Sequence, residues 1–215
     1  MGWPDVSVIG GPFERHRHYL QLSECYLLEE ETNLLEKISS SINSKIAMKV
    51  SYFIHGENQT YDNVIPYKIL NLNGNYFLAC EVETEYKFTI FRVAKIRSIL
   101  KSSKKFDHNQ NMLDFANSIQ TPFAKYSDNW KENMIKVKVE IDKSKTMYFE
   151  IKNHLLSQKI IKRKENGNII VTFEVTQEKE VEDLIKKWLP FIKVLEPITL
   201  DKKIKLDIEK YLNYS

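Results

Sequence analysis

Aromatic and cationic side chains alternate with apolar ones in the middle of the chain, a pattern suited to ligand binding. Successive side chains of a β-strand point to opposite faces, so Phe77 and Arg92 are predicted to share a face opposite the core. An aromatic ring and a planar guanidinium on one surface can meet a nucleobase and its phosphate. The residues predicted to fill the core behind them are Tyr76, Leu78, Phe91 and Val93.

Further aromatic and basic residues are expected to extend this binding surface: Tyr52, Tyr67, Lys68, Lys95 and Arg97. Arg92 offers a planar fork for bidentate contact with a phosphate, whereas Lys95 provides a point charge with less geometric demand. The alternative interpretation is that this basic face is only solvated.

The charge distribution points to the same part of the chain. The 215 residues include 32 basic and 29 acidic ones, and the net charge of +3 argues against a polybasic nucleic-acid binder. By segment, the net charge is −4 over residues 1–35, +5 over residues 36–106 and +2 over residues 107–215. The middle third is therefore the basic part.

Motifs for other chemistry are absent from the sequence. There is no Gly-x-Ser-x-Gly, Walker or His-Glu-x-x-His motif. The two cysteines, Cys25 and Cys80, form no Cys-x-x-Cys unit, and His16 and His18 have no third ligand nearby. We expect no catalytic residue, no metal and no cofactor, and keep an enzyme acting on nucleic acid as a further hypothesis.

The elements that must position the basic residues follow from hydrophobic periodicity. Residues 1–22 contain Pro4, Gly10, Gly11 and Pro12 and are interpreted as an irregular arm or linker. Apolar residues at three- and four-residue steps predict an amphipathic helix over 23–46. About five short strands up to residue 106 then predict a small half-open β-barrel, with a hairpin turn at Asn73-Gly74 and an edge, bulge or bend at Pro66.

A connector over residues 107–134, with a short helix near 112–119, leads to a second predicted domain over 135–215. Its pattern indicates a strand (135–141), a helix (147–156), a hairpin (159–163 and 169–175), a helix (178–189) and a strand (192–195). This β-α-β-β-α-β order is typical of a ferredoxin-like domain, and a helix over 200–212 follows it. The expected fold class is α+β.

The segment over residues 23–106 resembles a WYL domain, the ligand-sensing module of many bacterial transcription regulators. The resemblance rests on ordered motifs: Lys49-Val50-Ser51-Tyr52, Val64-Ile65-Pro66-Tyr67-Lys68-Ile69-Leu70, Asn73-Gly74-Asn75-Tyr76-Phe77-Leu78-Ala79 and Phe91-Arg92-Val93-Ala94-Lys95-Ile96. Tyr76-Phe77-Leu78 stands at the place of the eponymous Trp-Tyr-Leu. The remainder resembles the C-terminal extension that commonly follows a WYL domain, through Trp188, Val194-Leu195-Glu196-Pro197 and the helix ending near Tyr214. The resemblance implies a small barrel of the SH3/Sm-like type.

Several positions depart from the family pattern. Phe77 lacks the hydroxyl of the family tyrosine, Ala94 replaces an expected Asp, and Lys95 replaces an expected Arg. Regulators of this family normally begin with a winged helix-turn-helix, which this chain does not contain. We expect either a stand-alone WYL protein or a piece of a longer regulator.

Two functional hypotheses follow from the resemblance. The first is the ligand-sensing part of a homodimeric WYL regulator that binds single-stranded nucleic acid or a nucleotide on the basic barrel face and reaches DNA through a helix-turn-helix outside this chain. The second is a stand-alone accessory protein that binds single-stranded nucleic acid and modulates a phage-defence or RNA-guided system. No apolar run reaches the roughly 18 residues of a membrane span, and we expect a cytoplasmic protein without membrane contact.

Overall fold

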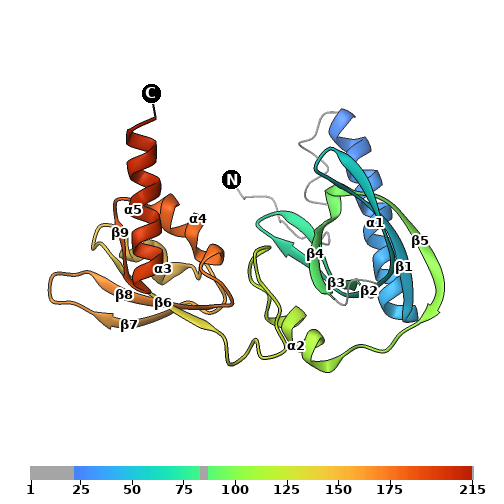
Figure 1. Cartoon of the computed structure of the whole chain (residues 1–215). Coiled ribbons are helices and arrows are strands. Elements are labelled where there is room, and N and C mark those ends of the chain that lie inside the picture. The colour runs from blue at the N-terminus through green and yellow to red at the C-terminus, as the bar shows by residue number, and fades with distance from the viewer. Residues whose placement is uncertain (1–21, 83–86, 215) are drawn as a thin grey trace, which may run out of the picture.

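The computed structural model describes residues 22–82 and 87–214, with side chains in the first helix described from Glu29 onward. Two lobes lie side by side, joined by a segment that contains α2 (Gln110–Ser118) (Figure 1). Each lobe has its own antiparallel sheet, so the fold is mixed α+β, as the sequence predicts. Of the predicted arm over residues 1–22, only Leu22 falls within the described residues.

The first lobe consists of a long helix and a five-stranded sheet. The elements are α1 (Leu22–Ser44), β1 (Ile46–Ile54), β2 (Glu57–Leu72), β3 (Asn75–Val82), β4 (Lys87–Arg92) and β5 (Ile96–Lys105). The strand order is β4-β3-β2-β1-β5, with every neighbouring pair antiparallel. A short 3₁₀ turn, η2 (Val93–Lys95), joins the two edge strands β4 and β5.

The hairpin turns of this sheet adopt the backbone conformation that their residues favour. Asn73 and Gly74 have φ values of +53° and +79°, as a type I′ turn requires at both central positions. His55 and Gly56, with φ of +52° and +88°, make a second turn with positive φ at both positions. Pro66 lies at a register shift between β2 and β3, because proline has no N–H to donate to the ladder.

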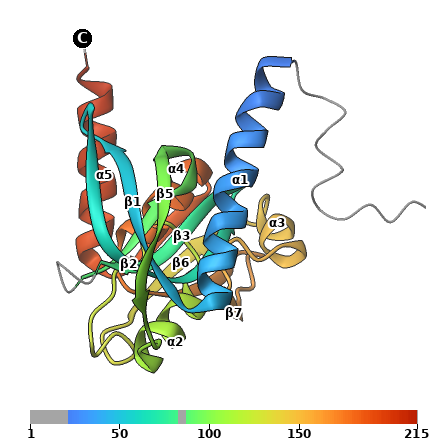
Figure 2. The same ribbon diagram turned by 90° about the vertical axis from the view of Figure 1, so that its right-hand side faces the viewer.

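Apolar side chains cover both faces of the first sheet. On one face, Leu35 and Ile38 of α1 pack in a core that contains Leu78 of β3. On the other, Phe115 of α2 packs in a second core that contains Phe77. Figure 2 shows α1 running alongside the strands and α2 at their lower end. The predicted connector is therefore part of a hydrophobic core.

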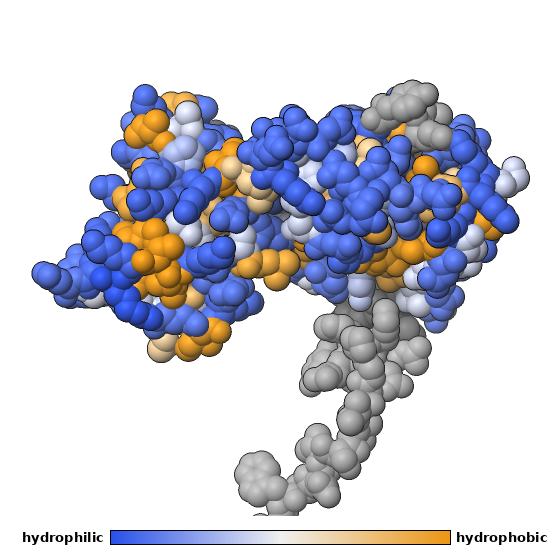
Figure 3. Space-filling model, turned by 90° about the horizontal axis from the view of Figure 1, so that it is seen from below, coloured by the Kyte–Doolittle hydropathy of each residue, from blue (hydrophilic) through white to orange (hydrophobic). Residues whose placement is uncertain are grey.

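The second lobe follows the predicted order of elements. They are β6 (Ile135–Ile141), α3 (Thr146–Ile151), β7 (Lys159–Arg163), β8 (Ile169–Val175), α4 (Lys179–Trp188), β9 (Ile192–Glu196) and α5 (Ile198–Leu212). The strands lie in the order β7-β8-β6-β9, and their apolar side chains share one core with the helices. Seen from below, the surface of both lobes is mostly hydrophilic, with separate apolar patches (Figure 3).

Helix α3 is shorter than the predicted helix over 147–156. It ends at Ile151, and the side chain of Gln158 binds backbone groups in and after its last turn. The Gln158 amide donates to the carbonyl oxygen of Phe149 at 2.7 Å and accepts from the N–H of His154 at 2.9 Å. Because a side chain satisfies these backbone groups, the helix need not continue.

The segment between α2 and β6 is bonded to the second lobe as well as packed on the first. The Gln120 amide donates to the carbonyl oxygen of Glu174 at 2.7 Å and accepts from the N–H of Ser157 at 3.0 Å. The Thr121 hydroxyl donates to the buried carboxylate of Glu180 at 2.9 Å.

None of the described helices combines the length and apolar character that a membrane span needs.

One buried carboxylate holds α4 and α5 together. Glu182 is 2% exposed and lies 2.7 Å from Lys186, 2.8 Å from Lys203 of α5 and 3.4 Å from Lys179. Burial alone raises the pKa of a carboxyl group, but the three ammonium groups outweigh it and lower the pKa of Glu182 to about 2.

We expect Glu182→Gln to lower the free energy of unfolding at neutral pH by about 3 kcal/mol, because a pKa depressed from 4.5 to about 2 represents that much interaction with the ionised form. This stabilisation is fully present above the unfolded-state pKa and is lost as pH falls from about 4.5 towards about 2. Urea denaturation at several pH values measures it.

The matched control is Glu209→Gln, an exposed carboxylate on α5, which should change the stability little. Glu182→Gln and the unaltered protein should converge in stability at acidic pH. A constant difference between them from neutral to strongly acidic pH would contradict the assigned role.

Candidate nucleic-acid interface

Three of the seven predicted binding residues gather around η2. Arg92 ends β4, Lys95 ends η2 and Arg97 is the second residue of β5, and all three are exposed. Their cationic groups make no ion pair with any carboxylate of the described residues; Arg92 and Arg97 contact neutral partners instead. The turn therefore presents three positive charges within six residues of chain.

Two neighbouring side chains position Arg92. The Arg92 guanidinium donates to the side-chain oxygen of Asn75 at 2.6 Å, and its backbone N–H donates to the hydroxyl of Tyr52 at 3.3 Å. Tyr52 is buried in the α1-side core, with its ring 4.5 Å from that of Phe91. Burial raises the pKa of Tyr52, so its hydroxyl is neutral at pH 7. Tyr52 thus supports the turn from beneath rather than extending the exposed surface.

The aromatic ring beside the cations is one that the sequence analysis does not select. The Arg97 guanidinium lies 4.8 Å from the ring centroid of half-buried Phe53 in a cation–π contact. Phe53 follows Tyr52 in β1 and therefore points to the opposite face. Antiparallel pairing of β1 with β5 brings Phe53 to Arg97, and nothing in the local sequence indicates that pairing.

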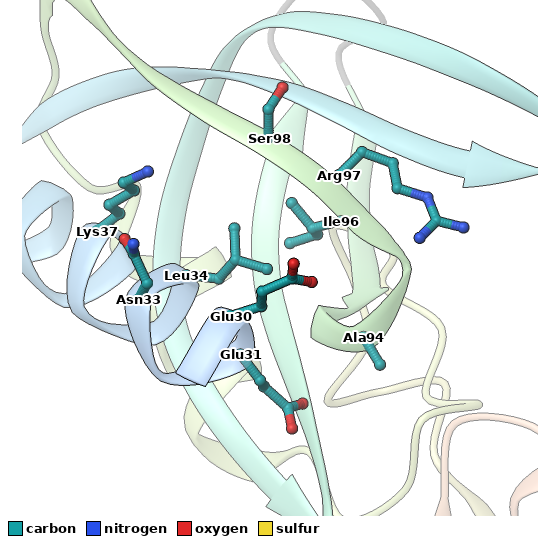
Figure 4. A pocket seen from close by; sticks show the side chains of 9 residues that line it. All are labelled: Glu30, Glu31, Asn33, Leu34, Lys37, Ala94, Ile96, Arg97 and Ser98. Carbon is teal, nitrogen blue, oxygen red and sulfur yellow. The ribbon is translucent and has the colours of Figure 1, made fainter. Parts of the chain in front are cut away.

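A pocket of about 440 Å³ lies between α1 and the η2–β5 segment. Figure 4 shows Glu30, Leu34 and Ile96 pointing towards its centre, whereas the Arg97 guanidinium extends away. Glu31, which also lines it, is partly buried, and this burial raises the pKa of Glu31, with the positive charge of Arg92 offsetting part of the rise. The cationic turn therefore has an acidic neighbour in α1, which the sequence analysis did not pair with it.

The other three predicted residues lie on the face covered by α2. Phe77 and Tyr67 are 9% and 4% exposed, and both belong to the core that contains Phe115. The Tyr67 hydroxyl donates to Glu81 at 3.0 Å and accepts from the backbone N–H of Asn109 at 3.2 Å, and burial raises its pKa. The Lys68 ammonium donates to Asn117 of α2 at 3.0 Å.

The prediction that Phe77 is presented to solvent beside Arg92 is therefore wrong. The two residues do pair across β3 and β4, but Arg92 lies at the strand end, where the covering segment does not bury it. Phe77 lies further inside, beneath α2 and the residues that follow. Strand alternation predicts the correct face for Phe77, but it carries no information on what covers that face.

The histidine and acidic side chains within residues 22–82 and 87–214 form no metal site. Among the described residues, no three histidine, cysteine, aspartate or glutamate side chains gather as metal ligands do. His108 contacts the carbonyl oxygen of Pro66 at 2.9 Å and packs near Tyr67. His154 packs near Phe149 and Trp188, and partial burial lowers its pKa.

The second lobe matches a known family. Residues 133–212 fit the family model described as "WCX domain". We call this part of the chain the WCX domain after that match. The WCX domain is the WYL-associated C-terminal extension, and the match confirms the resemblance that the sequence shows over the C-terminal part of the chain. No curated protein matches the chain.

Two solved structures are similar to the chain. A crystal structure of a CRISPR Cas-related protein aligns over 87% of this chain and 52% of its own, with a TM-score of 0.50 and 13% identity. Proteasome accessory factor B/C (PafBC) of Arthrobacter aurescens aligns over 86% of this chain and 28% of its own, with a TM-score of 0.36 and 14% identity. The chain spans about half or less of the length of these two proteins. The likeness to the first concerns the fold alone.

We expect Phe77→Ala to lower the free energy of unfolding by about 3–5 kcal/mol, because it removes a buried ring and leaves a cavity beneath α2. Phe53→Ala is the matched control, and because the Phe53 ring is only half-buried, its removal should lower the free energy of unfolding less. Urea denaturation of both variants makes the comparison. A Phe77→Ala protein of unchanged stability would contradict the assignment of this ring to the core.

Proposed function

We propose that this chain is the ligand-sensing part of a WYL-type transcriptional regulator and binds single-stranded nucleic acid or a nucleotide at the η2 turn. In this proposal the first sheet is the SH3-like barrel of a WYL domain, and the WCX domain is ferredoxin-like. The β7-β8-β6-β9 strand order and the WCX match support the architecture. The exposed cations at η2 support the ligand.

The single observation that carries the proposal is the positioning of Arg92. Asn75 binds one nitrogen of its guanidinium, and no described carboxylate forms an ion pair with it. A guanidinium held in one orientation loses less side-chain entropy when it binds a phosphate. Its remaining N–H donors can then make charge-assisted hydrogen bonds to phosphate oxygens, which are stronger than neutral ones.

The neighbouring residues suggest how a nucleotide lies on the turn. Lys95 adds a second cation that holds a phosphate without strict geometry. The guanidinium of Arg97, stacked on Phe53, offers a flat cationic surface on which a base can stack. The carboxylates of Glu30 and Glu31 border the site and repel additional phosphates. The site is therefore better suited to a short strand or a mononucleotide than to a long polyanion.

The proposal includes a regulatory role for the chain. The chain acts as a homodimer, catalyses no reaction, and controls DNA binding by a helix-turn-helix supplied outside these residues. An accessory protein of an RNA-guided or phage-defence system would use the same turn to bind a single strand. Both roles require ligand binding at the η2 turn, so this binding is tested first.

We expect Arg92→Ala to weaken the binding of labelled single-stranded DNA or RNA roughly 10- to 100-fold, because charge-assisted hydrogen bonds contribute about 1.5–3 kcal/mol. Fluorescence anisotropy at several salt concentrations measures the affinity. Mononucleotides are tested in parallel as competitors.

Lys49→Ala is the control, since it removes one positive charge from the same sheet at a position paired with Asp62. It should leave the affinity nearly unchanged. Equal affinity of Arg92→Ala and the unaltered protein, for strands and for mononucleotides, would exclude the η2 turn as the site.

A further inference from the structure

One face of the sheet in the WCX domain is free of helices. The odd-numbered residues of β6 and β8, such as Val139 and Val171, lie in the core together with residues of α3, α4 and α5. The even-numbered residues point to the opposite face because side chains alternate along a strand. No described helix contributes side chains to that opposite face, which we call the open face.

Lysine side chains are distributed across the open face by the strand register. Lys159 of β7 pairs with Thr172 of β8, which pairs with Lys138 of β6, and this row ends at Glu196 of β9. The next row contains Lys162, Ile170, Glu140 and Lys193 in the same strand order. Lys136, two residues before Lys138, lies opposite Glu174. The two edge strands, β7 and β9, and the central strand β6 thus each contribute lysine side chains to the open face.

Most of these lysines are not neutralised. Lys138 pairs with Glu196 at 3.3 Å, and Glu140 is bound by Lys164 at 2.7 Å. Four others are exposed and form no ion pair among the described residues: Lys136, Lys159, Lys162 and Lys193. On the helical side, in contrast, lysines such as Lys186 and Lys203 are paired with carboxylates. The strand register therefore gathers four unpaired lysines on one sheet surface, whereas the other unpaired lysines of the domain, such as Lys187 and Lys210, lie on different helices.

The composition of the open face favours one kind of partner. The core of a protein–protein interface is typically more apolar than the rest of the protein surface. Here Ile170 and Thr172 at the centre are buried, and among strands β6, β7, β8 and β9 Ile161 is the only large apolar side chain that is exposed. No aromatic residue of these strands faces outward, so bases have no ring to stack on. Spaced cations without apolar or aromatic anchors complement a phosphate backbone, contacted without regard to sequence.

We propose that the open face of the WCX domain is a second nucleic-acid surface, which binds the phosphate backbone of a single strand through Lys136, Lys159, Lys162 and Lys193. The surface is separate from the η2 turn and uses point charges instead of an oriented guanidinium. Binding there depends strongly on salt and is independent of base sequence.

The test replaces the four lysines together by glutamine in the full chain. For a single strand, the slope of log affinity against log salt concentration changes by about 0.7 per phosphate contact. We expect the quadruple variant to lose up to about 2.8 units of that slope for labelled oligothymidylate. Anisotropy titrations between about 50 and 200 mM salt measure the slopes.

The matched control replaces four other exposed lysines that form no ion pair among the described residues and lie outside the open face, on or beside the helices: Lys152, Lys187, Lys202 and Lys210. Both variants change the net charge equally, so a general charge effect would lower both slopes alike. Equal loss in the two variants, an unchanged slope in the open-face variant, or no binding by the unaltered protein would each overturn the proposal.

This design can refute the open-face proposal and the η2 proposal independently of each other. Arg92→Ala combined with the quadruple variant shows whether the effects add, as expected for distant independent contacts. If Arg92→Ala has no effect but the quadruple variant loses its salt dependence, the η2 proposal fails and the open face stands. The converse result removes the open face alone.

Discussion

The candidate site depends on the burial of both faces of the first sheet. α1 covers one face and α2 with its following segment covers the other, so aromatic side chains such as Phe77 and Phe91 are packed against helices. Burial of that apolar surface contributes about 25 cal/mol per Å², and it leaves the strand ends and connecting turns as places for polar groups. Arg92, Lys95 and Arg97 are exposed because they lie at such a turn, where β4 passes into β5.

The same packing explains why Arg92 has a defined orientation. Tyr52 is held in the core and its hydroxyl accepts from the Arg92 backbone, while Asn75 follows the tight Asn73-Gly74 turn and binds the guanidinium. The core thereby fixes the position of a side chain that is itself exposed to solvent. Glu31, which α1 brings close enough to Arg92 for the cation to affect its pKa, moderates the positive charge of the turn.

The two lobes are connected by a segment with contacts on both sides. Trp130 packs in the α2-side core of the first lobe, while Gln120 donates to Glu174 of β8 and Thr121 donates to Glu180 of α4. Such a segment restricts the movement of one lobe against the other more than a flexible linker does. The η2 turn and the open face therefore have limited freedom to move relative to each other.

The amino-acid sequence by itself determined most elements and turns. Strict alternation in Ile135–Ile141 specified β6 to the residue, and the hairpin pattern specified β8 over Ile169–Val175. Asn73-Gly74 specified a further hairpin turn. These signals depend only on near neighbours. The motifs in the C-terminal part also sufficed to indicate the extension, which the WCX match supports. Only the tertiary structure decided that Phe77 is buried, that Phe53 lies beside Arg97 and that Glu31 approaches Arg92. Each of these contacts joins residues from elements distant in the chain, and long-range packing is not encoded in the local periodicity from which strands and helices are predicted.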